Sequence, residues 1–122
     1  MKAKDLMIGD WVNIAVEEYN NPTRIREIGS FWVKVIKDEM EYSNILVTPI
    51  PLTPEILEKN GFVRSEVFVE WKYEYEDIYM LWKPFPWLSV LSDGSELKFP
   101  CEYVHQLQHA LRLCGIEKEI VL

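Results

Sequence analysis

The sequence predicts an α+β fold, with a small N-terminal antiparallel sheet or SH3-like barrel, a short linking helix, and an antiparallel meander covered by a C-terminal helix. Three patterns support this. Short apolar runs separated by turn residues occupy the N-terminal part, apolar and polar side chains alternate over 67–75, and a helical amphipathic period marks 103–114. The 122 residues suit one domain, with a barrel-like part expected at 1–52 and the other elements at 53–122.

The N-terminal part is expected to contain short strands bounded by turns. The apolar runs predict four of them, at 11–16, 23–28, 31–37 and 44–48. Gly29-Ser30 is a connection typical of a hairpin between the second and third strands. Residues 49–52 read Pro-Ile-Pro-Leu, and because proline has no backbone donor, this stretch should leave the sheet and act as a connector.

The linking helix is specified at both ends by its own residues. Thr53 is a good N-cap, Pro54 suits the first helical position, and Gly61 supplies a left-handed residue after the last turn. Leu57 should anchor the helix by packing against an apolar residue on either side of it, Leu52 and Phe62.

The C-terminal half is expected to form the meander and its covering helix. One strand face should carry Val67, Val69, Trp71, Tyr73 and Tyr75. Ser92-Asp93-Gly94-Ser95 is the strongest hairpin signal in the chain. The buried face of the helix should carry Tyr103, Val104, Leu107, Ala110, Leu111 and Cys114, and its solvated side His105, Gln108, His109 and Arg112. Residues 119–122 are expected to be an edge strand or a frayed tail.

Charge disfavours a nucleic-acid partner. The chain has 13 Lys plus Arg against 20 Asp plus Glu, a formal net charge of −7, whereas duplex binding needs a clustered positive field. The N-terminal sheet offers the only such cluster, beside one aromatic side chain: Arg24, Arg26, Trp32, Lys34 and Lys37. A nucleic-acid-binding module that uses this sheet is therefore the alternative function.

Catalytic and metal-binding patterns are weak. Cys101, His105 and His109 recur every four residues, which would align three metal ligands on one helical face, but that face is expected to be solvated. Cys101 beside His105 could form a thiol nucleophile, although no motif surrounds it. A thiol or metal-dependent enzyme is the third hypothesis. The isolated glycines form no phosphate-binding loop, so no cofactor is predicted.

Two further patterns concern charge and compartment. The carboxylates Glu66, Glu70, Glu74, Glu76 and Asp77 could serve acid–base chemistry, but strand alternation favours a solvated sheet face. Cys101 and Cys114 lie in one expected helix, too far apart to form a disulfide. The N-terminus lacks a signal-peptide pattern and no run resembles a membrane span, so a cytoplasmic protein without a membrane partner is predicted.

The segment Trp-Lys-Pro-Phe-Pro-Trp at 82–87 combines rigid prolines with aromatic rings, which suits a partner surface because little side-chain entropy is lost on docking. A core-covering crossover is the other interpretation. The preferred function is a non-enzymatic protein-interaction module whose partner and oligomeric state the sequence leaves open. Its predicted partner-binding residues are Trp82, Phe85 and Trp87.

Three stretches together resemble a family: DLMIGDWV near the N-terminus, PIPLTPEILEKNGF in the middle and YVHQLQHALRLCG near the C-terminus. In that order they resemble small uncharacterised proteins of gut bacteria and of their phages or integrated elements. The resemblance spans most of the chain. It implies a cytoplasmic, phage-related or mobile-element setting, and it implies no activity, cofactor or site residue.

Overall fold

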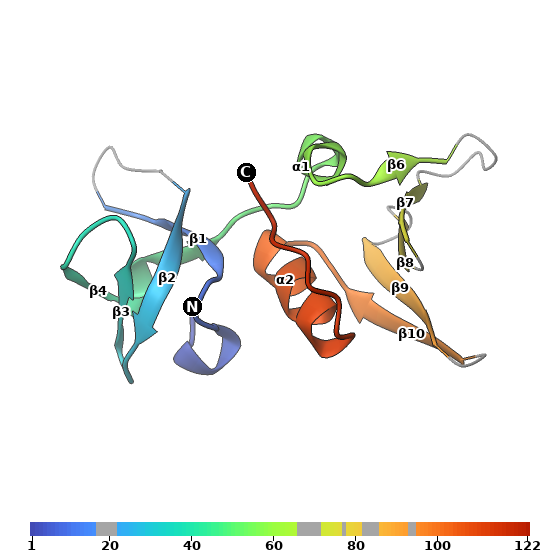
Figure 1. The fold of residues 1–122 in the computed structure, drawn as a ribbon. Helices are drawn as coiled ribbons and strands as arrows, with labels where there is room; N and C mark the ends of the chain where they lie inside the picture. The colour runs from blue at the N-terminus through green and yellow to red at the C-terminus, as the bar shows by residue number, and fades with distance from the viewer. Residues whose placement is uncertain (17–21, 66–71, 77, 82–85, 93–94) are drawn as a thin grey trace. The chain divides into compact units, whose positions relative to one another are not determined.

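The computed structural model describes residues 1–16, 22–65, 72–76, 78–81, 86–92 and 95–122 (Figure 1). The predicted α+β fold is confirmed, with two five-stranded antiparallel sheets and two α-helices. The chain divides into two compact units, each with one of the sheets: Met1–Ile50 with Tyr103–His105, and Pro51–Glu102 with Gln106–Leu122. The boundary after Ile50 is close to the predicted one after Leu52.

The first unit holds a five-stranded sheet and two 3-10 helices. Its elements are η1 Ala3–Asp5, β1 Trp11–Ile14, β2 Pro22–Ile28, β3 Trp32–Val35, β4 Glu41–Ser43, η2 Asn44–Leu46 and β5 Val47–Pro49. The strand order is β4-β3-β2-β1-β5, with every pair antiparallel. Strands β1 to β4 form a meander, and β5 returns to pair with β1 after the 3-10 turn η2.

The predicted single strand at 44–48 is wrong. A 3-10 turn interrupts it, because the Val47 N–H bonds to the Asn44 carbonyl and the Asn44 N–H bonds to the Phe31 carbonyl at 3.0 Å. The chain therefore pairs twice, first through β4 with β3 and then through β5 with β1. Apolar patterning in the sequence does not reveal this interruption, since Ile45 and Leu46 are as apolar as strand residues.

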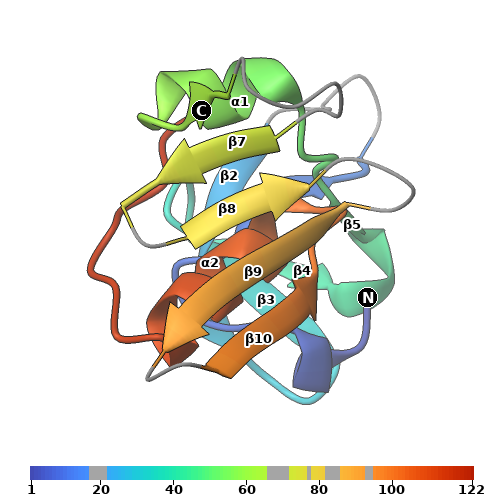
Figure 2. The same ribbon diagram turned by 90° about the vertical axis from the view of Figure 1, so that its right-hand side faces the viewer.

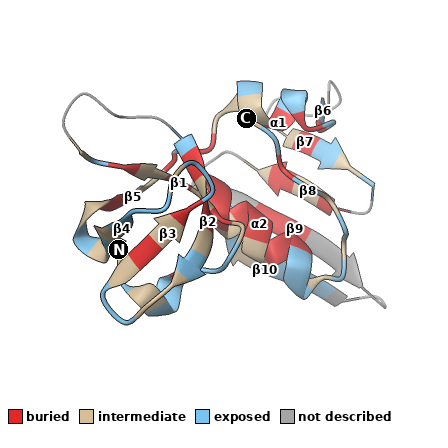
Figure 3. Ribbon diagram, turned by 60° about the vertical axis from the view of Figure 1, so that its left-hand side comes forward, coloured by how far each residue is buried: buried red, intermediate tan, exposed pale blue. Residues whose placement is uncertain are grey.

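The first unit's core lies on one face of its sheet. Alternate strand positions are buried and their neighbours are half-buried or exposed, as Figure 3 shows along β1, β2 and β3. This is the period of two expected for a sheet with one face packed. The core cluster consists of Leu6, Val12, Ile14, Ile25, Val33, Val35 and Val47.

The linking helix, α1 Pro54–Lys59, has the predicted caps. The Thr53 hydroxyl accepts a hydrogen bond from the Ile56 N–H at 3.3 Å. At the other end the Phe62 N–H bonds to the Leu57 carbonyl at 3.0 Å, and Gly61 has a φ of 88°. These are the contacts of a Schellman motif. Leu57 is fully buried, as expected of an anchor.

The second unit holds a meander. Its strands are β6 Val63–Arg64, β7 Lys72–Tyr75, β8 Ile78–Leu81, β9 Trp87–Ser92 and β10 Ser95–Pro100, in the order β10-β9-β8-β7-β6 (Figure 2). Ser92 pairs with Ser95, which confirms the predicted hairpin. Tyr73 is buried and Glu74 exposed, so the predicted alternation holds there. Of the other expected members of this face, Tyr75 is half-buried, and Val67, Val69 and Trp71 lie outside the described residues.

The C-terminal helix, α2 Val104–Leu113, has residues from Gln106 onward in the second unit, and it lies along one face of that unit's sheet (Figures 1 and 2). Four residues predicted to be buried are buried: Val104, Leu107, Ala110 and Leu111. The predicted exposure of His105 and Gln108 is wrong, because each is only 6% exposed. The predictions for Tyr103 and Cys114 are also wrong, because both side chains are half-buried. The covered face of α2 is thus wider than its apolar stripe.

The C-terminal tail is neither an edge strand nor frayed. The Asn60 side chain holds Val121 with two hydrogen bonds of 2.8 Å, one from its Nδ2 to the Val121 carbonyl and one from the Val121 N–H to its Oδ1. Asn60 is 1% exposed, and so is Ile120. A buried amide at the end of α1 therefore fixes the tail, since both of its polar atoms are satisfied there.

Candidate functional site

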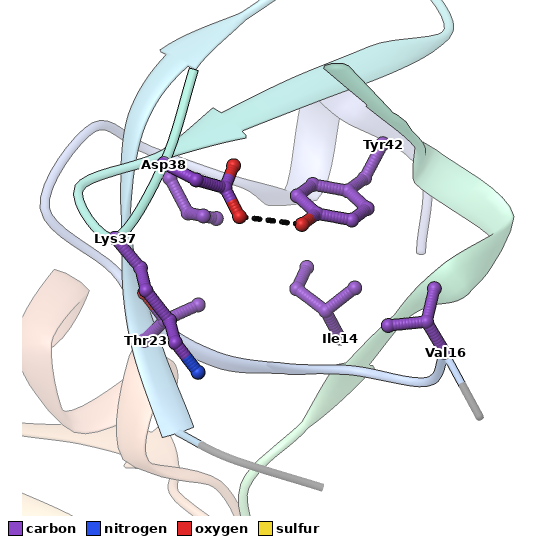
Figure 4. A pocket seen from close by; sticks show the side chains of 7 residues that line it. Ile14, Val16, Thr23, Lys37, Asp38 and Tyr42 are labelled. Atoms are coloured by element: carbon purple, nitrogen blue, oxygen red, sulfur yellow. Dashed lines mark hydrogen bonds between the residues drawn. The ribbon is translucent and has the colours of Figure 1, made fainter. Parts of the chain in front are cut away.

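A cavity of about 270 Å³ lies at one end of the first unit's sheet (Figure 4). Strands β1 and β3 both run antiparallel to β2, so their last residues meet where β2 begins. Ile14 ends β1, Val35 ends β3, and Thr23 is the second residue of β2. The side chains that line the cavity are Ile14, Val16, Thr23, Val35, Lys37, Asp38 and Tyr42.

At the rim of this cavity the Asp38 carboxylate and the Tyr42 phenol are joined by a hydrogen bond. The Tyr42 hydroxyl donates a hydrogen bond to Asp38 Oδ2 at 2.6 Å (Figure 4). The Met40 N–H donates to Asp38 Oδ1 at 2.9 Å. These two hydrogen bonds, the Tyr42 bond first, lower the pKa of Asp38 below its ordinary value, and the neighbouring Lys37 charge acts in the same direction. The rim thus carries a fixed negative charge.

The walls of the cavity are apolar and its polar groups are few. Ile14, Val16 and Val35 supply aliphatic surface, and the polar groups at its edge are Thr23, Lys37, Asp38 and Tyr42. None of the lining side chains is a histidine, cysteine or serine. Apolar walls with a small number of placed polar groups are typical of binding pockets, and this arrangement can hold an apolar group and orient a charged one beside it.

Arg24 on β2 and Trp32 and Lys34 on β3 alternate with the buried core positions, so these three predicted nucleic-acid residues share the outward face of the sheet. Arg26 stands at the irregularity between Ile25 and Glu27. The Arg24 guanidinium lies 5.2 Å from the ring centroid of Trp11, its cross-strand neighbour. Arg26 forms an ion pair with Glu39 at 3.1 Å. Lys37 lines the cavity.

Lys34 and Trp32 lie close together on this outward face. The Lys34 ammonium lies 5.8 Å from the Trp32 ring centroid and 3.6 Å from a Glu27 carboxylate oxygen. Trp32 in turn lies against Gly29, where an added Cβ would come within 2.2 Å of the indole. Two of the four predicted cations, Lys34 and Arg26, therefore have carboxylate partners, which reduces the positive field of this face.

The expected metal and thiol groups do not share a helical face, because α2 begins at Val104, after Cys101. Burial raises the pKa of the fully buried Cys101 thiol to about 12, and neither Cys101 nor Cys114 forms a disulfide. His105 is buried and stacks on Tyr103, with ring centroids 5.9 Å apart. Within the part of the chain that the structure describes, no three His, Cys, Asp or Glu side chains are placed to hold a metal ion.

The predicted aromatic partner surface remains a prediction. Trp82 and Phe85 lie outside the described residues. Trp87 begins β9, where its backbone pairs with Leu81 and Pro100, but its side chain is not among those described.

The acidic segment is described only in part. Glu66, Glu70 and Asp77 lie outside the described residues. Glu74 is exposed and lies 3.2 Å from the Lys72 ammonium, which fits the predicted solvated face. Glu76 is also exposed, in a turn with a φ of 49°.

Sequence reasoning missed the cavity. The strand ends that form the cavity carry ordinary apolar residues, and Tyr42 belongs to none of the sequence patterns described above. One local signal was available: Asp38 and Tyr42 stand four residues apart across an acidic turn, a spacing that lets a phenol reach a carboxylate over a tight connection. That Ile14, Thr23 and Val35 meet beside them depends on strand pairing.

Comparison with protein-family models, with curated proteins and with solved structures gave no match. Among the described residues no helix has the length and apolar character needed to cross a lipid bilayer. Because one fold can carry many different functions, the function must be argued from the cavity and the surface around it.

Proposed function

We propose that this protein is a non-enzymatic protein-interaction module that takes an apolar side chain of its partner into the cavity at the end of the first sheet. The observation that carries the proposal is the position of this apolar-walled cavity beside exposed apolar groups. Ile36 and Met40, each 62% exposed, stand on the same β3–β4 turn as Lys37 and Asp38. A partner seated on this turn would cover them.

The dimensions of the cavity support one anchoring side chain. Its volume of about 270 Å³ is slightly below the range for small-molecule sites, which is about 300–1,000 Å³. Binding energy in protein interfaces concentrates where a large apolar or aromatic side chain enters a pocket and displaces water. Met40 would adapt to the surrounding partner surface, because its thioether side chain is unbranched and flexible.

A cytoplasmic setting is part of the proposal. It is supported by the two cysteines, neither of which forms a disulfide. The aromatic residues Trp82, Phe85 and Trp87 are retained as a second contact region, supported by their sequence pattern alone.

The test is to fill the cavity from its rim. Val16 is half-buried on the cavity wall, so Val16→Phe should occupy the space without opening the core. Peptides are first selected on the wild-type chain from a random displayed library, and their affinities are then measured by fluorescence anisotropy. Val16→Phe is expected to weaken binding by about tenfold or more.

The matched control is Ala15→Phe. Ala15 is the exposed neighbour of Val16 and is not among the residues that line the cavity. It receives the same ring outside the cavity and should leave affinity within about twofold. Equal affinities for wild type and Val16→Phe, with both proteins folded by circular dichroism, would refute the proposed function.

A further inference from the structure

Resting on this proposed function, we infer that the partner is a protein segment in which an apolar anchor residue is flanked by arginine or lysine. The anchor enters the cavity and the cation meets the acidic turn, defined as Asp38, Glu39 and Glu41 in the connection from β3 into β4. The inference names the chemistry of the partner; the proposed function requires only an apolar anchor.

Charge at the turn supports a cationic partner. Three carboxylates stand here against two cations, Lys37 within 36–41 and Arg26, which pairs with the Glu39 side chain, itself 86% exposed. The Glu41 side chain is exposed as well. Complementary charge at the edge of an apolar pocket raises the rate of association and rejects partners of the wrong sign.

The Asp38 carboxylate is held in place before any partner arrives. Its two oxygens are fixed by the Tyr42 hydroxyl and the Met40 N–H, at 2.6 and 2.9 Å. Each carboxylate oxygen can accept more than one hydrogen bond, so an incoming guanidinium or ammonium can still bind. In Figure 4 Asp38 and Tyr42 lie along the top of the cavity, and Lys37 runs down from beside Asp38 with its ammonium away from Tyr42, so the cation is expected on the Tyr42 side.

The same carboxylates distinguish a basic peptide from a nucleic acid. Phosphates would be repelled by the acidic turn, and the cations Arg26 and Lys34 are already paired with Glu39 and Glu27. Neutralising the acidic turn should therefore weaken the binding of a basic peptide, and it should not weaken the binding of a nucleic acid. This opposite response separates the two partner classes.

The experiment is a methyl NMR titration of the full chain with pools of heptapeptides that have three fixed central residues and random flanks. The fixed triplets are Arg-Leu-Arg, Glu-Leu-Glu and Arg-Ala-Arg, and a short DNA duplex is the fourth probe. The Arg-Leu-Arg pool should shift the methyl resonances of Ile14, Val16 and Val35, which line the cavity. The Glu-Leu-Glu and Arg-Ala-Arg pools should each bind about tenfold more weakly or not at all.

Variants locate the charge effect. The double variant Asp38→Asn with Glu39→Gln should weaken the Arg-Leu-Arg pool by about threefold to tenfold, and the Tyr42 hydroxyl can still donate to the new amide oxygen. Asp5→Asn is the matched control, because Asp5 is an exposed carboxylate of the same unit in η1, outside the turn. It should leave the affinity within about twofold.

The outcomes separate the inference from the proposed function. Equal binding of the Arg-Leu-Arg and Glu-Leu-Glu pools in the cavity would overturn the inference and leave the proposed function standing. No shift of the cavity methyl groups with any peptide pool would overturn both. DNA shifts without peptide shifts would replace both with the nucleic-acid alternative. An unchanged methyl spectrum of the free double variant establishes that its fold is intact.

Discussion

Asp38 accepts hydrogen bonds from the Tyr42 hydroxyl and the Met40 N–H, and its pKa is lowered as a result. Tyr42→Phe removes the larger of these two contributions, so the pKa of Asp38 should rise toward its ordinary value. The measurement is the carboxyl carbon shift of Asp38 followed from neutral to acidic pH. Tyr79→Phe, which removes a donor to Glu96 instead, should leave Asp38 unchanged. An Asp38 pKa that does not rise in Tyr42→Phe would contradict the hydrogen bond.

The lowered pKa of Asp38 also predicts in which direction the stability of the protein changes with pH. Because the folded-state pKa of Asp38 is lowered, its contribution to stability is complete above the unfolded-state pKa and is lost as the pH falls through the folded-state value. In Tyr42→Phe the folded-state pKa of Asp38 should move toward its unfolded-state pKa. Its unfolding free energy should therefore fall less steeply than that of the wild type over this acidic range, as measured by urea unfolding at several pH values.

The two thiols should differ in reactivity. Burial raises the pKa of Cys101 to about 12, so only about one molecule in ten thousand carries its thiolate near pH 8. Cys114 is half-buried. Iodoacetamide should modify Cys114 in the folded protein and Cys101 only after unfolding, as read by mass spectrometry of peptides. Prompt modification of Cys101 in the folded chain would show that its burial is wrong.

At the scale of elements, α1 depends on Leu57, which is fully buried, and on Gly61, which has a φ of 88°. Leu57→Ala should lower the free energy of unfolding by about 2–4 kcal/mol through lost burial and a residual cavity. Gly61→Ala should lower it by about 1 kcal/mol, because a Cβ is disfavoured in the left-handed region. Lys59→Arg on the exposed side is the control. Chemical denaturation measures all three, and equal midpoints would contradict these helix boundaries.

The end of α1 also fixes the chain terminus. Asn60→Ala leaves the Val121 N–H and carbonyl without the side-chain partners that lie at 2.8 Å. The variant should lose about 1–3 kcal/mol of unfolding free energy. The amide of Val121 should exchange with solvent much faster than in the wild type, whereas the amide of Leu57, bonded within the helix, should change only as the global stability does. An unchanged exchange rate at Val121 would show that Asn60 does not fix the tail.

At the scale of the whole molecule, the net charge of −7 and the ion pairs of Arg26 and Lys34 predict the response to nucleic acid. A labelled short DNA duplex should show no binding in the micromolar range at about 50 mM salt, because few cations can replace its counterions. Fluorescence anisotropy measures this. Binding that weakens steeply as salt rises would instead favour the alternative function on the first unit.

How much the sequence predicts depends on the range of the contacts. The helix α1 follows from residues no more than a few positions apart, from the Thr53 cap to the Phe62 N–H on the Leu57 carbonyl. The hairpin between β9 and β10, in which Ser92 pairs with Ser95, follows from the Asp-Gly pair in the sequence between them. The first sheet was expected as short strands, but its division at 44–48 was not, because Asn44 is held by Phe31 from another part of the chain.

The sequence by itself therefore determined the α+β class, the caps of α1 and the apolar stripe of α2, because these depend on local bonding and periodicity. Only the tertiary structure decided which polar residues are buried. His105 and Gln108 are covered on the flank of α2, and Asn60 binds a residue 61 positions away. The cavity also depends on the tertiary structure, since Ile14, Thr23 and Val35 come from separate strands and meet only after the sheet has formed.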